Sequence, residues 1–391
     1  MNIVIVGAGI GGLTAAVCLL QAGHSVRVYE QAAQLGEVGA GIQVSANAVK
    51  VLDSIGLRPL IESIIVRPKA FEFRRHDTGE LLHNIPLGER HEELHGAPYF
   101  HIHRADIHHA LQSAVKALDP AAIVPGARAV SVRETADNAT VLFADGSQVT
   151  ADLVVGADGI KSVVRQHVVG QDAPVFTGQV AWRCIVPTKL IPPELRIEVA
   201  TTVWCGPKNH AVTYYLRAGE LVNFVGCVER DWEEESWTAA RPWEDLDADY
   251  AGWHPKVRAV IEHVDRKQCF RWALNNRVPS MVWSTPRVTM LGDAVHSTLP
   301  YMAQGAVMAI EDAAVLTRAL ALDMPLEQRL KAYERHRAPR TDRIVRESTE
   351  MGNLYHISDA AEMKKAFHDR DIARSRNMWL YPYEALKTPL I

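Results

Sequence analysis

The sequence predicts an α/β fold: a parallel sheet with helices, a second domain built on an antiparallel or mixed sheet, and a helical C-terminal region. Three observations predict it. Short β-branched runs occur three times, each followed by a glycine-containing turn and a helical pattern, which is typical of parallel strands. Between the second and third runs, strand-like segments alternate with polar turns. From about residue 326 the pattern is helical and charged.

The first of these junctions occupies residues 2–30. The apolar run Ile3–Val6 predicts a buried strand. A helical pattern follows from about Gly11 to Ala22, and a second strand is predicted for Ser25–Tyr29. The order of strand, glycine turn, helix and strand indicates a βαβ unit.

Gly7, Gly9 and Gly12 form G-x-G-x-x-G between the first strand and the helix, and Glu30 ends the second strand. In such a motif the first glycine permits a tight turn, the second admits a pyrophosphate, and the third lets the helix pack on the strand. The helix N-terminus attracts phosphate, and the acidic residue accepts hydrogen bonds from a ribose. We therefore predict a Rossmann-like site for an ADP group; the alternative is a glycine-rich turn in an unrelated α/β protein.

Composition limits the class of protein. The chain has 391 residues, 48% of them hydrophobic and 23% charged, with a formal net charge of −4, which is ordinary for two or three globular domains. No basic segment indicates nucleic-acid binding, and no signal peptide or membrane-spanning run is visible. Five cysteines without C-x-x-C spacing, and histidines without other ligands at metal spacing, predict a cytoplasmic protein with reduced thiols and no metal site.

Residues 59–98 contain alternating segments that predict strands of a sheet inserted into the nucleotide-binding fold. Residues 99–117 run from a strand into a helix, with Asp106 as a helix-start residue. Arg104 lies at this strand–helix boundary, where it could contact a pyrophosphate or a ribityl chain; a surface cation is an equal alternative. Residues 121–150 predict a meander of short strands.

The second junction, Leu153–Val155, leads into Asp158 and Gly159 and then a helix. The third, Val288–Leu291, leads into Asp293, whose carboxylate can bind the hydroxyls of a ribityl or ribose chain. A loop containing Pro300 then reaches Gly305 and Ala306, where a helix begins that should run to about Leu320. The positive end of that helix could stabilise negative charge on a reduced flavin ring.

Residues 175–285 differ in composition: they hold eight of the nine tryptophans and predict an antiparallel sheet with an aromatic face. Core packing explains most of these tryptophans, and the remaining aromatic surface suits a flat ligand. We expect a nucleotide-binding domain of residues 1–175 and 286–325, a substrate domain of 176–285, and a C-terminal helical region of 326–391.

The three junctions together carry the motifs GAGIGG, GADGIKSVVR and LGDAVHSTLPYMAQGAVMAIEDA, in this order. From residue 2 to about 340 the chain resembles the single-component, or class A, FAD-dependent aromatic hydroxylases. It is most similar to the salicylate, 3-hydroxybenzoate and 6-hydroxynicotinate monooxygenases. The stretches EVGAGIQVSANAVKVLDSIGL, PYFHIHRADIHHAL and MAQGAVMAIEDAAVLTR carry that likeness.

The resemblance implies FAD as cofactor and assigns roles to residues at matching positions. The ADP half of FAD would contact the glycine loop and Glu30, and Arg104 would contact the FAD chain. The pyrophosphate would lie near the second junction, and the ribityl chain and the ring would lie near the third. The implied FAD-binding residues are Gly7, Gly9, Gly12, Glu30, Arg104, Asp158, Gly159, Asp293, Pro300, Gly305 and Ala306.

The resemblance also implies a substrate site. Relatives carry H-x-x-x-Y on a strand, here His210 and Tyr214, and a spacing of four places both side chains on one face of a strand. They are the predicted catalytic pair; two core aromatics are the alternative. Gln43 and Tyr301 stand where hydroxynicotinate enzymes have histidine, and Pro300 stands where 3-hydroxybenzoate enzymes have glutamine. The substrate pocket should therefore be identical to that of neither subgroup.

The implied reaction is hydroxylation of a phenolic or hydroxypyridine carboxylate by NAD(P)H and O2 through a flavin C4a-hydroperoxide, with or without decarboxylation. His210 or Tyr214 would remove the phenolic proton, and Arg183 could anchor a carboxylate or form a structural salt bridge. Family practice favours NADH as a transient reductant, and the protein should be a monomer or homodimer. Two alternatives stay open: a flavoprotein oxidoreductase acting on a non-aromatic substrate without oxygen insertion, and a regulatory protein that has lost its chemistry.

Overall fold

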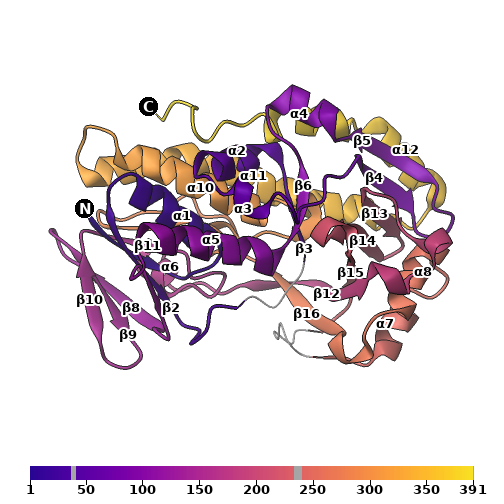
Figure 1. Ribbon diagram of the computed structural model, residues 1–391, viewed down its shortest axis with the longest axis horizontal. Coiled ribbons are helices and arrows are strands. Elements are labelled where there is room, and N and C mark those ends of the chain that lie inside the picture. The colour runs from indigo at the N-terminus through magenta and orange to yellow at the C-terminus, as the bar shows by residue number, and fades with distance from the viewer. Residues whose placement is uncertain (37–40, 233–239, 391) are drawn as a thin grey trace.

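The computed structural model describes residues 1–36, 41–232 and 240–390. A five-stranded parallel sheet lies at the centre of one half of the molecule (Figure 1). Its order is β17 (Val288–Met290), β11 (Leu153–Gly156), β1 (Asn2–Val6), β2 (Ser25–Glu30) and β7 (Ile123–Pro125). The strands of the three predicted junctions are therefore neighbours, and their carboxyl ends meet at one edge, where ligands bind in open α/β sheets.

Helices α1 (Ile10–Gln21), α5 (Arg104–Leu118) and α10 (Gly305–Leu320) pack together beside this sheet. The contact between α1 and α10 depends on Gly11, because a Cβ atom there would lie 2.8 Å from the Leu291 side chain and 2.9 Å from Ala309 Cβ. The predicted helices and strands of the first and third junctions thus form as expected.

A seven-stranded sheet forms the other half. Its order is β16 (Phe270–Asn276), β12 (Val175–Pro187), β15 (Leu221–Glu229), β14 (Asn209–Leu216), β13 (Thr201–Gly206), β4 (Ala70–Arg75) and β5 (Leu81–Pro86). The sheet is mixed because β4 pairs with β13 in parallel, whereas its other pairs are antiparallel.

The strands predicted within residues 59–98 form, but they do not make a sheet inserted into the nucleotide-binding fold. β4 and β5 instead extend the seven-stranded sheet. Phe71 and Phe73 are buried, and they share a core with Val203 of that sheet. Burial of these phenylalanines against the sheet accounts for the placement. The domain boundaries at residues 175, 286 and 326 stay a prediction.

Two small sheets and several short helices complete the halves. The meander consists of β8 (Ala129–Glu134), β9 (Ala139–Phe143) and β10 (Gln148–Ala151), and β3 (Gly41–Val44) pairs with β6 (Phe100–His103). The other helices of these halves are α2 (Ala46–Ser54), α3 (Arg58–Ile61), α4 (Glu89–His95), α6 (Val163–Val168), α7 (Trp243–Asp249), α8 (Pro255–Glu262) and α9 (Asp293–His296).

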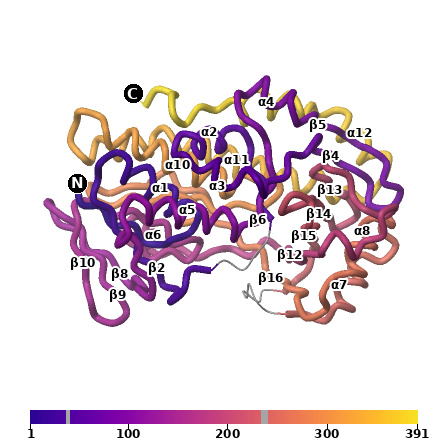
Figure 2. Tube along the Cα trace, viewed as in Figure 1, coloured from indigo at the N-terminus to yellow at the C-terminus, as the bar shows by residue number. Residues whose placement is uncertain are grey.

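The C-terminal region is helical, as predicted: α11 (Leu326–Tyr355), α12 (Ala360–Asp369) and α13 (Ile372–Ser375). The chain then returns along the molecule, so both termini lie toward the same end of its long axis (Figure 2). No helix in the described part of the chain combines the length and apolar character needed to cross a bilayer.

Candidate active site

The three glycines of the motif after β1 differ in the space around them, as far as the described residues show. Gly7 has a φ of +103°, and a Cβ atom there would lie 2.4 Å from the Ala157 carbonyl oxygen. At Gly12 a Cβ atom would lie 2.1 Å from the Gly7 carbonyl oxygen, but at Gly9 it would meet nothing within 4 Å. The first and third glycines are needed for packing, and the second faces open space, which fits a bound pyrophosphate.

A cavity of about 120 Å³ lies beside this loop, with Glu30 in its wall. The Glu30 carboxylate accepts hydrogen bonds from the backbone N–H groups of Ala8 and Ala32, both at 2.9 Å. His108 also lines the cavity, and its Nε2 lies 2.7 Å from the Ala8 carbonyl oxygen. The carboxylate and the open loop fit the ribose and phosphates of an ADP group. The sequence analysis did not place His108 at this cavity.

Asp158 of the second junction closes the N-terminus of α6. Its carboxylate accepts hydrogen bonds from Ser162 Oγ at 2.5 Å and from the Val163 N–H group at 2.8 Å. Burial raises the pKa of Asp158, although these hydrogen bonds oppose the rise. Gly159 follows with a φ of +76° and open space around it. Because Ala157 touches Gly7, this loop borders the glycine loop, and contact of Asp158 with a pyrophosphate stays a prediction.

Arg104 and Asp293 come together from separate elements. Arg104 begins α5 and Asp293 begins α9. Burial lowers the pKa of the Arg104 guanidinium, and the nearby Asp293 carboxylate opposes that shift. The structure corrects the expected helix start: His103 Nδ1, not Asp106, accepts the hydrogen bond from the first turn, at 3.2 Å. Asp106 instead binds Arg217 through two contacts of 2.9 Å.

Hydrogen bonds to residues near the start of α2 hold the loop from Pro300 to Ala306 in place. Ala303 adopts a left-handed φ of +55°, and Gln304 is buried. The Gln304 side chain accepts a hydrogen bond from Asn47 Nδ2 at 3.2 Å and donates one to Ser45 Oγ at 3.1 Å. Helix α10 then begins at Gly305, the predicted residue. This network fixes the position of the helix N-terminus, and no motif in the sequence predicted it.

Tyr301 turns from this loop toward the seven-stranded sheet. Its ring centroid lies 4.9 Å from that of His210, in an edge-to-face arrangement. Its hydroxyl contacts the Gln179 side chain, and its carbonyl oxygen accepts a hydrogen bond from Tyr355 at 2.9 Å. Gly352 of α11 makes this packing possible, because a Cβ atom there would lie 2.5 Å from the Tyr301 ring. The structure therefore brings two predicted residues, His210 and Tyr301, into contact.

His210 and Tyr214 occupy alternate positions of β14, opposite Cys227 and Asn223 of β15. They share one face of the strand but have different neighbours. The Tyr214 ring centroid lies 4.5 Å from that of His101, and Gly41 lies so close that a Cβ atom would be 2.5 Å from the Tyr214 ring. Burial raises the pKa of the Tyr214 phenol.

Gln43 belongs to a polar cluster at the Tyr214 end of the strand. Its Oε1 accepts hydrogen bonds from Tyr99 at 2.6 Å and from Thr201 at 3.4 Å. Thr201 Oγ1 lies 2.6 Å from His101 Nε2. Burial lowers the pKa of His101 to about 3, so this histidine is neutral. The cluster offers neutral donors and acceptors beside Tyr214.

His210 also heads a chain of polar contacts that sequence reasoning missed. Its Nδ1 lies 2.7 Å from Nε2 of His356, and Nδ1 of His356 lies 2.8 Å from the Glu229 carboxylate. Burial lowers the pKa of His210 well below its ordinary value, and the neighbouring His356 adds to the effect. The sequence has no local signal for this chain, because His356 lies 146 residues beyond His210.

Arg183 is buried on β12, with its guanidinium carbon 5.1 Å from the centroid of the Trp272 ring. Burial lowers its pKa to about 10, and the proximity of Arg104 contributes. Both roles considered for Arg183, carboxylate anchor and structural cation, are compatible with this position.

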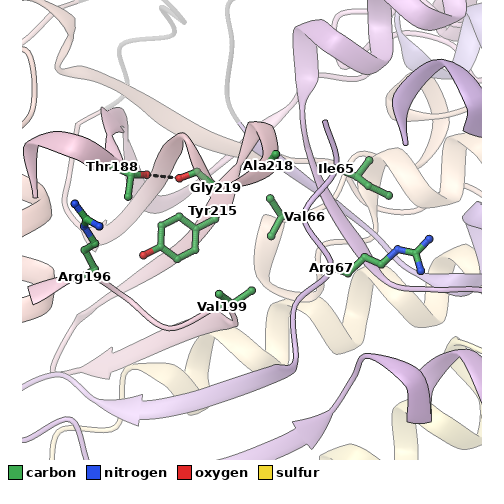
Figure 3. A pocket seen from close by; sticks show the side chains of 9 residues that line it. All are labelled: Ile65, Val66, Arg67, Thr188, Arg196, Val199, Tyr215, Ala218 and Gly219. Carbon is green, nitrogen blue, oxygen red and sulfur yellow. Dashed lines mark hydrogen bonds between the residues drawn. The ribbon is translucent and has the colours of Figure 1, made fainter. Parts of the chain in front are cut away.

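Figure 3 shows the residues that line a second cavity, of about 490 Å³. Tyr215 lines it, and Tyr215 points away from the face that carries Tyr214 because side chains alternate along a strand. Its two cations are already engaged: Arg67 binds Glu62 at 2.7 Å, and Arg196 donates to the Ile191 carbonyl oxygen at 3.1 Å. This cavity is separate from the polar residues described above.

Residues 1–348 match the FAD binding domain family. The chain is 38% identical to 3-amino-4-hydroxybenzoate 2-monooxygenase of Streptomyces platensis, over 98% of this chain and 96% of that protein. It is 38% identical to 3-hydroxybenzoate 6-hydroxylase of Klebsiella oxytoca (92% and 89% covered). It is 33% identical to 6-hydroxynicotinate 3-monooxygenase of Pseudomonas fluorescens (100% and 97% covered).

A solved structure agrees with these relatives. HpxO of Klebsiella pneumoniae, complexed with FAD and uric acid, superposes with a TM-score of 0.85 at 27% identity, covering 96% of this chain and 95% of that one. The similarity therefore extends over both sheets and the C-terminal helices.

Proposed function

The chain belongs to the FAD-dependent aromatic-ring monooxygenases, and from this premise we propose that it hydroxylates a phenolic or hydroxypyridine carboxylate. The family match confirms the resemblance to FAD-dependent aromatic hydroxylases that the three junctions indicated. It also confirms FAD as the cofactor. The substrates named for the relatives share a six-membered aromatic ring that bears a hydroxyl and a carboxyl group. The observation that carries the proposal is the contact between His210 and Tyr301, which joins the substrate sheet to the loop before α10.

Residues of the parallel-sheet edge would hold the cofactor. Gly9 offers space for the pyrophosphate, Glu30 a carboxylate for the ribose, and Arg104 with Asp293 a charged pair for the connecting chain. Held there, FAD would supply the redox chemistry of a monooxygenase: electrons from NAD(P)H and O2 would be consumed, with one oxygen atom entering the aromatic ring and the other leaving as water. The N-terminus of α10, fixed by Gln304, would stabilise negative charge that develops in front of it.

His210 and Tyr214 would act on the substrate hydroxyl. Removing its proton raises the electron density at the ortho and para carbons, which favours attack by electrophilic oxygen. Burial keeps His210 neutral, so that it can accept this proton, and keeps Tyr214 protonated, so that it can donate a hydrogen bond. The rings of Tyr301 and Tyr355, both beside His210, would exclude water from the reacting groups.

The test is NADH oxidation by the FAD-loaded protein with 3-hydroxybenzoate, 3-amino-4-hydroxybenzoate and 6-hydroxynicotinate, with peroxide and product measured together. We expect at least one compound to accelerate oxidation and to gain one oxygen atom without matching peroxide. The products would also show whether CO2 is lost. Oxidation of a non-aromatic substrate, with no oxygenated product from any aromatic compound, would favour an oxidoreductase without oxygen insertion.

A further inference from the structure

We propose that His210, His356 and Glu229 form a proton relay that carries the substrate's hydroxyl proton from the buried site to solvent. The proposal rests on the proposed function and deepens it, because it assigns a task to two residues outside every sequence motif. His356 and Glu229 would act through His210 and would touch neither substrate nor cofactor.

The relay runs from the interior to the surface. His210 exposes 1% of its surface, the His356 side chain 5%, and the Glu229 side chain 42%. The two contacts are 2.7 Å and 2.8 Å long, which is within the range of good hydrogen bonds. A proton that leaves a buried site must reach solvent through protein groups or ordered water. These three side chains form a continuous path of hydrogen bonds from the buried His210 to the half-exposed Glu229.

Glu229 decides which nitrogen of each ring carries a proton. An ionised carboxylate only accepts hydrogen bonds, so His356 must donate to it from Nδ1. A neutral His356 then has an unprotonated Nε2, which must accept from Nδ1 of His210. A neutral His210 is therefore unprotonated at Nε2. The hydrogen bonds of the relay therefore favour the His210 tautomer whose Nε2 is free to accept a proton, which is the tautomer needed to remove a phenolic proton.

Each transfer in the relay balances. The substrate O–H gives its proton to His210 Nε2, and His210 passes the proton on Nδ1 to His356 Nε2. His356 passes the proton on its Nδ1 to the Glu229 carboxylate, which releases a proton to water. The net change is one proton moved from the substrate to solvent. Passage of a proton in the opposite direction, when the product leaves as a phenol, restores both original tautomers.

Neighbouring elements hold the relay in place. The His210 ring lies against Tyr301 and Tyr355, with centroids 4.9 Å and 5.1 Å away. His356 directly follows the end of α11, and Glu229 ends β15, where its backbone N–H group donates to the Lys208 carbonyl oxygen at 2.9 Å. The relay thus joins the substrate sheet to the C-terminal helical region.

The experiment follows proton release by the FAD-loaded protein in weakly buffered solution. A pH indicator is mixed with the protein and with whichever of the three aromatic acids the wild type hydroxylates, while flavin absorbance reports binding. In His356→Gln we expect proton release to be slower by about 10-fold or more, the order of effect of a general base. Flavin content and ligand affinity should stay within about twofold of wild type, and added imidazole should restore part of the rate.

Glu229→Gln gives a second test at an exposed position, because the amide keeps an oxygen acceptor but cannot accept the proton. We expect slower proton release here too. Glu220→Gln, an exposed glutamate beyond the other end of the same sheet, is the matched control and should behave as wild type. If His356→Gln fails to fold or to retain FAD, the rate of proton release in Glu229→Gln is by itself the test of the relay.

Two outcomes would overturn the relay in distinguishable ways. Wild-type rates of proton release in Glu229→Gln, together with wild-type rates in any folded His356→Gln, would mean that the contacts are only structural. If the wild type neither binds nor hydroxylates any of the three aromatic acids, the proposed function and the relay fail together.

Discussion

Tyr214 provides the sharpest test of the substrate site at the scale of one residue. We expect Tyr214→Phe to lower the rate of hydroxylation by about 10-fold or more, or to divert a matching share of NADH to peroxide, because the phenol no longer holds the substrate hydroxyl. FAD content should not change. Product and peroxide formed per NADH are the measurement.

Tyr215→Phe is the matched control for that change. The Tyr215 hydroxyl donates to the Ile197 carbonyl oxygen at 2.9 Å on the opposite face of β14, so its loss should leave coupling intact. Equal effects in both variants would remove Tyr214 from the proposed mechanism.

Asp293 tests the cofactor site in the same way. Asp293→Ala removes the carboxylate beside Arg104, and a lost charged hydrogen bond costs about 1.5–3 kcal/mol, or roughly a 10- to 100-fold weaker affinity for FAD. Titration of the FAD-free protein with FAD measures this affinity. Asp323→Ala, at an exposed turn, should bind FAD as wild type does. Unchanged affinity in Asp293→Ala would exclude Asp293 from the predicted role.

Individual residues could be predicted where a contiguous motif defines them. Gly7 and Gly12 are fixed by packing that their own motif creates, and Asp293 is fixed by its place after a strand. His356 and Gln304 could not be predicted, because their partners lie far away in the chain. Only the tertiary fold creates those contacts.

At the scale of elements, α10 and α11 are joined by a buried ionic cluster. Arg337 contacts Glu311 and Asp312, both at 2.7 Å, and Arg340 contacts Glu311 at 2.8 Å. Burial alone would raise the pKa of Glu311, but Arg340 and Arg337 outweigh it and lower the pKa below its ordinary value. Glu311 also accepts a hydrogen bond from Asn47, so the cluster supports the network under Gln304.

The lowered pKa of Glu311 predicts how stability depends on pH. The folded state favours the ionised form, so the stabilisation is complete above the unfolded pKa of about 4.3 and is lost as pH falls through the folded value. Glu311→Gln should cost about 3–5 kcal/mol at pH 7, because it leaves Arg340 without its carboxylate partner and Arg337 with Asp312 alone. Since a protonated glutamate resembles glutamine, the difference from wild type should shrink as the pH falls below about 4.

Chemical denaturation at pH 7, 5, 4 and 3 measures that difference. Asp342→Asn is the control, since Asp342 pairs with Arg346 on the exposed face of α11 and should show little effect at any pH. A difference between wild type and Glu311→Gln that is constant over this range would contradict the assignment of an ionised Glu311.

The elements themselves could be predicted better than their partners. Alternation identified β4 and β5 as strands, but alternation contains no information about which sheet a strand joins. The choice was made by the burial of Phe71 and Phe73 against a core formed by residues more than a hundred positions later. The parallel sheet was easier to predict, because each of its three junctions has the same local pattern of a strand, a glycine-containing turn and a helix.

At the scale of the whole molecule, α11 connects the two halves. Its first part contributes Leu330 and Tyr333 to the core around the parallel sheet, and its last part contributes Leu354 and Tyr355 to the core under the seven-stranded sheet. The same helix holds Tyr301 through Tyr355 and ends beside His356. One helix therefore contacts both cores and also holds Tyr301, a predicted substrate-binding residue.

This connection predicts that the two halves unfold together. Leu354→Ala truncates a buried side chain in the half that contains the seven-stranded sheet. It should lower the free energy of unfolding by about 2–5 kcal/mol. In thermal unfolding of the FAD-loaded protein, flavin fluorescence reports release of the cofactor, and tryptophan fluorescence reports mainly the substrate side, where most tryptophans lie. If α11 couples the halves, both midpoints should fall by the same amount, whereas Glu350→Ala, at an exposed position of the same helix, should move neither. A fall in the tryptophan midpoint alone would mean that the halves unfold independently, and that α11 does not transmit a loss of packing on the substrate side to the cofactor site.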